Sequence, residues 1–231
     1  MAGSGRAEVP FARFQAWADA IKGERVTFAE MARVTGATTP TYSRANAQGA
    51  VGVRHVVSYA RGVGESPLEA LRAALPWPFL VEDPEPSTAE WVSQSPHALI
   101  LGELATRFGG QPAPTPWPSG GTSVARWLDA ITPRRREAIR GAAASVGIGP
   151  DVYLTKKRRG SFTLTELSGL ASIGGHSARI AVVAQGVLTW EEVGLDGAER
   201  ARTLAAMPSV DLLEAVEGAT GQMKRELEHR S

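Results

Sequence analysis

The sequence predicts an all-α fold, with two helical domains joined by a proline-rich linker. Residues that favour helices (Ala, Leu, Glu and Arg) are abundant, and only short runs such as DVYL (151–154) and SFTL (161–164) are typical of strands. Proline and glycine are concentrated in LPWPFLVEDPEPS (75–87) and GGQPAPTPWPSGG (109–121), which contain too much of both for regular structure. We therefore expect a first domain at residues 8–82, a linker at 83–121 with one short helix near 98–108, and a second domain at 122–231.

Five short helices are expected in the first domain. The first spans about 11–22, where one face carries Phe14, Trp17, Ala18 and Ile21. The second begins at a capping box made by Thr27 and Glu30, and it ends at Gly36, which can take the left-handed backbone conformation.

The remaining three helices follow from proline positions and apolar spacing. A third helix is expected from Thr38 or Thr39, with Pro40 in its first turn, where the missing N–H costs nothing. The fourth lies in VRHVVSYARGVG (53–64). The fifth lies in SPLEALRAAL (66–75), with a serine cap and a proline at its first position.

The second and third predicted helices carry the most informative pattern. Glu30, Met31 and Ala32 precede the turn at Gly36, and TYSR (41–44) leads to a glycine at 49. This pattern resembles the helix-turn-helix of the Cro and lambda-repressor-like superfamily. The resemblance continues through VVSYARGVGESPLEAL, which matches the fourth and fifth helices of that family, and it covers about 50 residues. It implies that the third helix enters the major groove of DNA.

The resemblance also implies which side chains touch DNA. Arg44 is the candidate for reading guanine, because its guanidinium can donate to O6 and N7 together. Two amides near the end of the helix are expected to meet phosphates. The DNA-contacting set expected in this domain is Thr38, Thr39, Thr41, Ser43, Arg44, Asn46 and Gln48. The alternative interpretation is a helical hairpin with an exposed polar face and no nucleic-acid partner.

Part of the second domain resembles a distant copy of the same unit. In residues 162–194, Thr163 and Glu166 repeat the capping box, and leucines 164, 167 and 170 repeat the apolar stripe. The glycine pair 174–175 occupies the place of the turn or of the start of the recognition helix. A second recognition helix would then present His176, Ser177 and Arg179 to DNA. The alternative is an unrelated helical bundle that contacts a protein partner.

Basic residues are concentrated on either side of one predicted helix in the second domain. Residues 124–160 hold nine basic and three acidic residues, although the formal net charge of the whole chain is +1. Binding to a polyanion depends on the local field of such a patch. Phosphate contacts are therefore expected from Arg134, Arg135, Lys156, Lys157, Arg158 and Arg159. Solvated helix faces are the alternative.

Two units of this kind in one chain, with a proline-rich bridge and high Ala, Gly and Arg usage, resemble actinobacteriophage immunity repressors. The resemblance implies a transcriptional repressor that binds double-stranded DNA at operator sites. It leaves two oligomeric states open, a monomer with two DNA-contacting domains and a homodimer. The rival interpretation is an HTH regulator or antitoxin whose C-terminal domain binds a protein.

No catalytic or metal site is expected. The chain has no cysteine, and its four histidines lack the spacing of metal ligands. Neither glycine-rich stretch, 62–67 or 120–123, matches a phosphate-binding loop. We therefore expect no enzyme activity and no cofactor. A cytoplasmic protein without a membrane partner is expected, because no apolar run approaches the roughly 18 residues of a membrane span and MAGSGRAEVP lacks the apolar core of a signal peptide.

Overall fold

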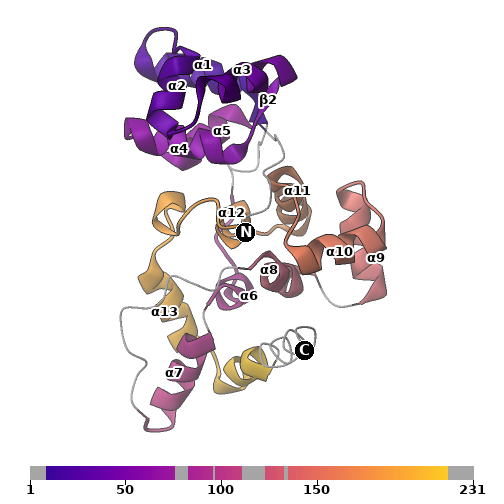
Figure 1. Cartoon of the computed structure of the whole chain (residues 1–231). Coiled ribbons are helices and arrows are strands. Elements are labelled where there is room, and N and C mark those ends of the chain that lie inside the picture. Colours follow the sequence, from indigo (N-terminus) through magenta and orange to yellow (C-terminus); the bar gives the residue numbers. More distant parts are fainter. Residues whose placement is uncertain (1–8, 76–82, 96, 111–122, 133–134, 218–231) are drawn as a thin grey trace, which may run out of the picture.

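The computed structural model describes residues 9–75, 83–95, 97–110, 123–132 and 135–217, and these are mostly helical. One two-stranded antiparallel sheet is present among them, in which β1 (Val9–Pro10) pairs with β2 (Ala50–Val51). The prediction of a mainly helical chain is confirmed. Figure 1 shows one helical body formed by α1–α5, a second beneath it, and α7 with α13 at the far end.

The first body contains the five expected helices: α1 (Phe11–Lys22), α2 (Phe28–Thr35), α3 (Thr39–Gln48), α4 (Val53–Val63) and α5 (Pro67–Ala74). Their ends follow the local signals. The Thr27 hydroxyl accepts the backbone N–H of Glu30, which is one half of the predicted capping box, while the Glu30 carboxylate pairs with Lys22. Ser66 caps α5 through its hydroxyl in the same way as Thr27. Gly36 ends α2 with φ of 69°, in the left-handed region that favours glycine.

An aromatic cluster holds α3 against the rest of this body. Phe14 is fully buried, and its ring lies 6.4 Å from that of Tyr42 and 5.6 Å from that of Tyr59. The Tyr42 hydroxyl donates to Thr35 Oγ1 at 2.8 Å, which joins the end of α2 to α3. Met31 and Ala32 are buried at the crossing, as expected. The angle between α2 and α3 is therefore set by both packing and a hydrogen bond.

Gly62 allows α4 to lie close to α2. A Cβ atom at this position would lie 2.5 Å from Cγ1 of Val34 and 3.0 Å from its carbonyl oxygen. A larger residue would push the two helices apart, so this glycine helps to position the turn before α3.

The second body contains α6 (Thr88–Ser93), α8 (Val124–Ile131), α9 (Arg136–Ser145), α10 (Pro150–Arg159), α11 (Leu164–Gly174) and α12 (Ala178–Ala184). The run DVYL, which is typical of a strand, is helical within α10. The capping box of Thr163 and Glu166 forms as predicted.

The predicted linker differs from the structure at its N-terminal end. Residues 83–95 belong to the second body, because α6 buries Trp91 and Glu90 against α8. The capping box of Ser87 and Glu90 was the sequence signal for this helix. The short helix expected near 98–108 is present as α7 (His97–Arg107). Residues 111–121 of the predicted linker, and residue 122 after it, lie outside the described residues.

Three helices form a smaller lobe at the far end. There α7 packs with α13 (Gly197–Ala206) and with the helical residues 209–217, around Leu99, Leu104 and Leu212. Arg107 donates to the backbone carbonyls of Leu204, Ala205 and Met207. These carbonyls lie at the end of α13, where the helix itself supplies no further N–H donors. This helix therefore docks on a segment about 100 residues later in the chain.

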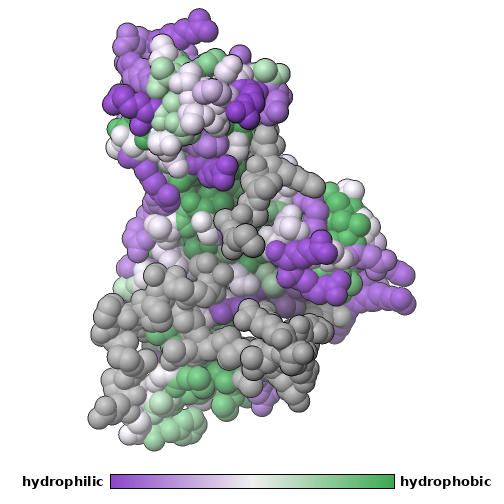
Figure 2. Space-filling model, viewed as in Figure 1, coloured by the Kyte–Doolittle hydropathy of each residue, from purple (hydrophilic) through white to green (hydrophobic). Residues whose placement is uncertain are grey.

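The two larger bodies are in direct contact. Arg61 on α4 forms a bidentate pair with Glu192 in the short 3₁₀ helix η2 (Glu191–Val193), at 2.6 and 2.8 Å. Pairing lowers the pKa of Glu192, and hydrogen bonds from Thr189 act in the same direction. One hydrophobic core runs through both bodies, and Figure 2 shows apolar surface at their junction.

Candidate nucleic-acid interface

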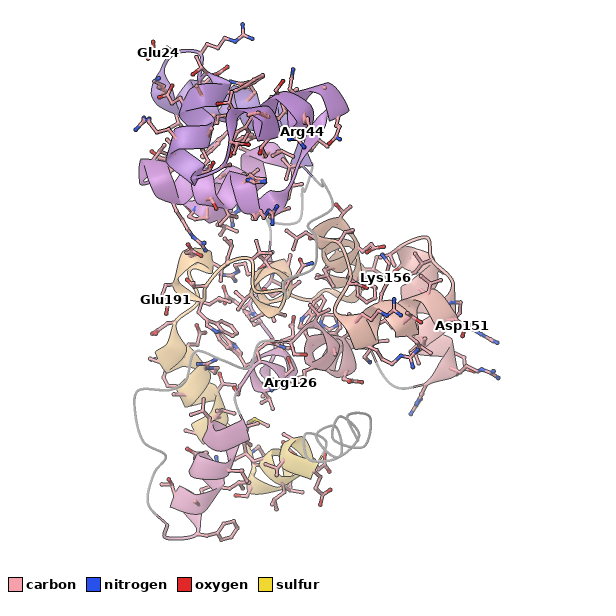
Figure 3. All side chains as sticks on the ribbon, in the orientation of Figure 1. Glu24, Arg44, Arg126, Asp151, Lys156 and Glu191 are labelled. Atoms are coloured by element: carbon pink, nitrogen blue, oxygen red, sulfur yellow. The ribbon has the colours of Figure 1, made fainter. Side chains whose placement is uncertain are left out.

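The side of α3 that faces away from the core carries the predicted DNA-contacting residues. Tyr42 and Ala45 are buried, at 0% and 7% exposed, and fix which side of the helix points inward. The side chains of Thr38, Thr39, Ser43, Arg44, Asn46 and Gln48 are exposed. Figure 3 shows Arg44 on α3 in the first body. The structure therefore brings these predicted residues together on one short helix.

Two of the predicted threonines bond to each other. The hydroxyls of Thr38 and Thr41 lie 3.0 Å apart, and the Thr41 backbone N–H donates to the Thr38 carbonyl. Thr41 is also half-buried. This hydrogen bond stabilises the first turn of α3. It also leaves fewer free hydroxyls on the helix for contact with DNA.

Exposed arginines lie on the helices that precede and follow α3 in the chain. Arg33 lies in the last turn of α2, and Arg54 lies in the first turn of α4. The N-cap of α4, Gly52, has no side chain to accept from the backbone N–H groups there. Cations and backbone N–H groups suit phosphate oxygens. Neither arginine belongs to the set predicted from the sequence, in which α2 and α4 are marked by their caps and apolar residues.

His55 lies behind the exposed face. It is half-buried on α4, and its ring centroid is 5.8 Å from that of Tyr42. Burial lowers the pKa of His55 below its ordinary value of 6.5, and the neighbouring Arg54 lowers it further. The imidazole is therefore neutral at pH 7 and packs as part of the support for α3.

This shift predicts a pH dependence of stability. The unfolded chain takes up the His55 proton near pH 6.5, whereas the folded chain takes it up only at lower pH. The free energy of unfolding is expected to fall as the pH drops below about 6.5. Urea unfolding at several pH values between 5.5 and 7.5 measures this, and His55→Gln should flatten the slope. An equal slope in the variant would contradict the assignment to His55.

The lysines of the second basic cluster are engaged within the protein. Lys156 Nζ lies 2.5 Å from Glu166, and Lys157 Nζ lies 2.7 Å from Asp129. Burial would raise the pKa of Glu166, but hydrogen bonds from Lys156 and Thr163 outweigh it, and the pKa is lowered. These two pairs join α10 to α11 and α8. Figure 3 shows Lys156 on α10, which belongs to the second body.

The arginines of the same cluster remain on the surface. Arg158 and Arg159 are exposed at the end of α10, and Arg135 is exposed just before α9. Arg134 lies outside the described residues. In Figure 2, hydrophilic residues gather over the part of the second body that contains α10. The phosphate-contacting surface expected from the sequence is therefore reduced to the arginines.

A salt titration of DNA binding, together with a stability measurement, distinguishes the role of the arginines in this cluster from that of the lysines. If the surface binds DNA, replacing Arg158 and Arg159 together with alanine should weaken binding to all sequences and reduce the slope of log K against log salt by up to about 2. Replacing Lys156 and Lys157 together should instead lower the free energy of unfolding, because their ion pairs with Glu166 and Asp129 are lost. The same salt slope in the arginine variant and the wild type would remove α10 from the interface.

The expected second recognition helix does not present its side chains to solvent. Every residue of α12 is buried except Arg179, which is partly exposed. Ser177 is fully buried. The prediction that these residues and His176 contact DNA is wrong for Ser177, which is buried, while Arg179 and His176 are partly exposed but lie against carboxylates of the protein itself. The seven residues of α12, ARIAVVA, are apolar on nearly all sides of the helix. This pattern is typical of a buried helix and is visible in the sequence.

Two acidic side chains from the start of the second body bind the beginning of α12. Asp83 accepts from the Ser177 hydroxyl at 2.6 Å and from Arg179 Nε at 2.7 Å. Glu90, only 1% exposed, accepts the backbone N–H of Ser177 at 3.0 Å, and its other oxygen is 3.7 Å from Nδ1 of His176. These carboxylates therefore engage the side chains that the sequence predicted to contact DNA.

The described residues include no group of three or more His, Cys, Asp or Glu placed to hold a metal ion. Within the same part of the chain, no helix is both long and apolar enough to cross a membrane.

Comparison with known proteins finds no matching family model, no matching curated protein and no matching solved structure.

Proposed function

We propose that the protein is a sequence-specific double-stranded DNA-binding repressor that reads the major groove with α3. The observation that carries this proposal is the exposed polar side of α3, held on a rigid aromatic core by Tyr42. A helix can read base edges only if its outward side is free and its orientation is fixed. Both conditions are met by α3, whereas α12 meets only the second.

The charge around α3 supports the same proposal. Arg33 and Arg54 are exposed on the helices before and after it, and phosphate contacts from such positions set the register of a protein on a duplex. Serine, arginine and amide side chains on α3 can hydrogen-bond to base edges. The five-helix arrangement of α1–α5 fits the resemblance to lambda-repressor-like domains, and a phage immunity repressor is the specific form that we propose.

The second body would add contacts that carry no sequence information. Its exposed arginines at the ends of α9 and α10 suit phosphates. Because Arg61 and Glu192 join the two bodies, both surfaces would meet DNA in a constant relative position. A single chain could then bind an asymmetric site, and a homodimer on a palindrome is the other arrangement.

A protein partner for the C-terminal lobe is the second candidate function. Large apolar side chains are exposed on this lobe, on α7, just after α7 and on residues 209–217. They are Leu101, Phe108, Val210 and Leu213, which are 50%, 75%, 59% and 46% exposed. Several exposed apolar groups on one small lobe are typical of a protein contact. On this view the protein is an HTH regulator or antitoxin whose lobe binds another protein.

Selection from a randomised duplex library with the full-length protein tests the proposal. We expect enrichment of one motif, and measured affinity for it that falls steeply as salt is raised from 50 to 200 mM. A long asymmetric motif would support the one-chain arrangement, and a palindrome would support the homodimer. The absence of any enriched motif would contradict the proposal and favour the protein-partner alternative.

A further inference from the structure

A proline lies at the centre of the outward side of α3. Pro40 is exposed in the first turn of this helix, which begins at Thr39. Successive residues of an α-helix are rotated by about 100°, so Pro40 lies roughly 200° around the axis from Tyr42. Tyr42 is fully buried. The proline ring therefore faces the side on which a bound duplex would lie.

Two of the hydroxyls near Pro40 are already engaged, whereas the exposed Thr39 lies about 100° around the helix from it. Thr38 and Thr41 bond to each other through their hydroxyls, at 3.0 Å. Proline itself has no side-chain donor or acceptor and no backbone N–H. The N-terminal end of α3 thus offers DNA an apolar contact at its most outward position, with Arg44 one turn further along.

We propose that Pro40 recognises a thymine through its C5-methyl group. This inference rests on the proposed function of α3. Residues at the N-terminal end of a recognition helix contact base edges, and the thymine methyl is the apolar group of the major groove. Pro40 and Arg44 are four residues apart, which is about 6 Å along the helix, or roughly two base-pair steps. The thymine should lie within about two base pairs of the guanine that Arg44 reads.

The competing explanation is that Pro40 only starts the helix. Proline suits the first turn of a helix whether or not DNA is bound. A substitution at this position alone would lower affinity in either case. Removing the methyl group from the DNA and the ring from the protein, separately and together, distinguishes the two explanations.

The experiment uses the duplex enriched by the full-length protein. Each thymine is replaced in turn by deoxyuridine, which lacks only the C5-methyl group, and Kd is measured by fluorescence anisotropy. For the wild type we expect about a fourfold loss of affinity at one thymine, as for one buried methyl group. In Pro40→Ala the same replacement should change Kd little. Pro67→Ala, which removes the buried proline at the first position of α5, is the control for loss of a helix-starting proline and should keep the fourfold ratio.

Three outcomes would overturn the inference. A fourfold ratio that persists in Pro40→Ala would assign the methyl contact to another residue. If no thymine is sensitive in the wild-type complex, there is no methyl contact, while the enriched motif would still support the proposed function. If no motif is enriched, both proposals fail together. The wild-type series does not depend on whether the variant folds.

Discussion

Replacing Arg44 with alanine is expected to abolish the preference for one base pair in the selected site. Arg44 is exposed near the middle of the outward side of α3, and a guanidinium can donate to O6 and N7 of guanine at once. Loss of such a pair reduces discrimination by about 1–3 kcal/mol, or roughly 5-fold to 150-fold. Kd values for the four base pairs at that position, measured for the wild type and the variant, give this number directly.

Two controls distinguish base reading from general charge. Arg44→Lys keeps the positive charge but has no planar fork, so the preference should weaken while the salt dependence stays similar. Arg54→Ala removes another exposed cation of the same body. It should weaken binding to all sequences about equally, with the base preference retained. An unchanged preference in Arg44→Ala would show that a different residue reads that position.

The largest effect on stability is expected from Glu90→Ala. Glu90 is 1% exposed and accepts hydrogen bonds from Trp127 Nε1 at 3.1 Å and from the backbone N–H of Ser177 at 3.0 Å. Trp127 and Ser177 are themselves fully buried, so water cannot replace the lost acceptor. Each buried donor left without a partner costs about 1–3 kcal/mol. We expect the free energy of unfolding to fall by about 2–4 kcal/mol, measured by urea denaturation.

The control for this substitution is an acidic residue of the same segment. Glu85 is 78% exposed at its side chain and pairs with Arg179 at 3.2 Å. Glu85→Ala should change the free energy of unfolding by less than about 1 kcal/mol, since exposed ion pairs contribute little. Glu90→Gln keeps the size and one acceptor oxygen, so its effect should be intermediate. Equal effects of Glu85→Ala and Glu90→Ala would contradict the role of Glu90 as a buried acceptor.

Local signals in the sequence predicted the first body well. Caps and left-handed glycines act within a few residues, so Thr27, Ser66 and Gly36 marked helix ends correctly. The alternation of buried and exposed positions on α3 also followed from its sequence, because Tyr42 is its one large apolar side chain. The exposed side of α3 could therefore be identified without a structure.

The second candidate surface could not be identified in the same way. A charged side chain looks free in a sequence unless its partner is close along the chain. The partner of Lys156 is 10 residues away, that of Lys157 is 28 residues away, and Asp83 is 96 residues from Arg179. Such pairs form only when packing brings distant segments together.

The sequence by itself determined the helical character of the chain, the helix ends and the polar side of α3. These features depend on backbone hydrogen bonding and on side-chain periodicity, which are local properties. Only the tertiary structure decided which segments cover α12, that residues 83–95 belong to the second body, and that the α10 lysines are paired. The physical reason is that burial and ion pairing depend on which distant segments meet, and that is settled by the packing of the whole core.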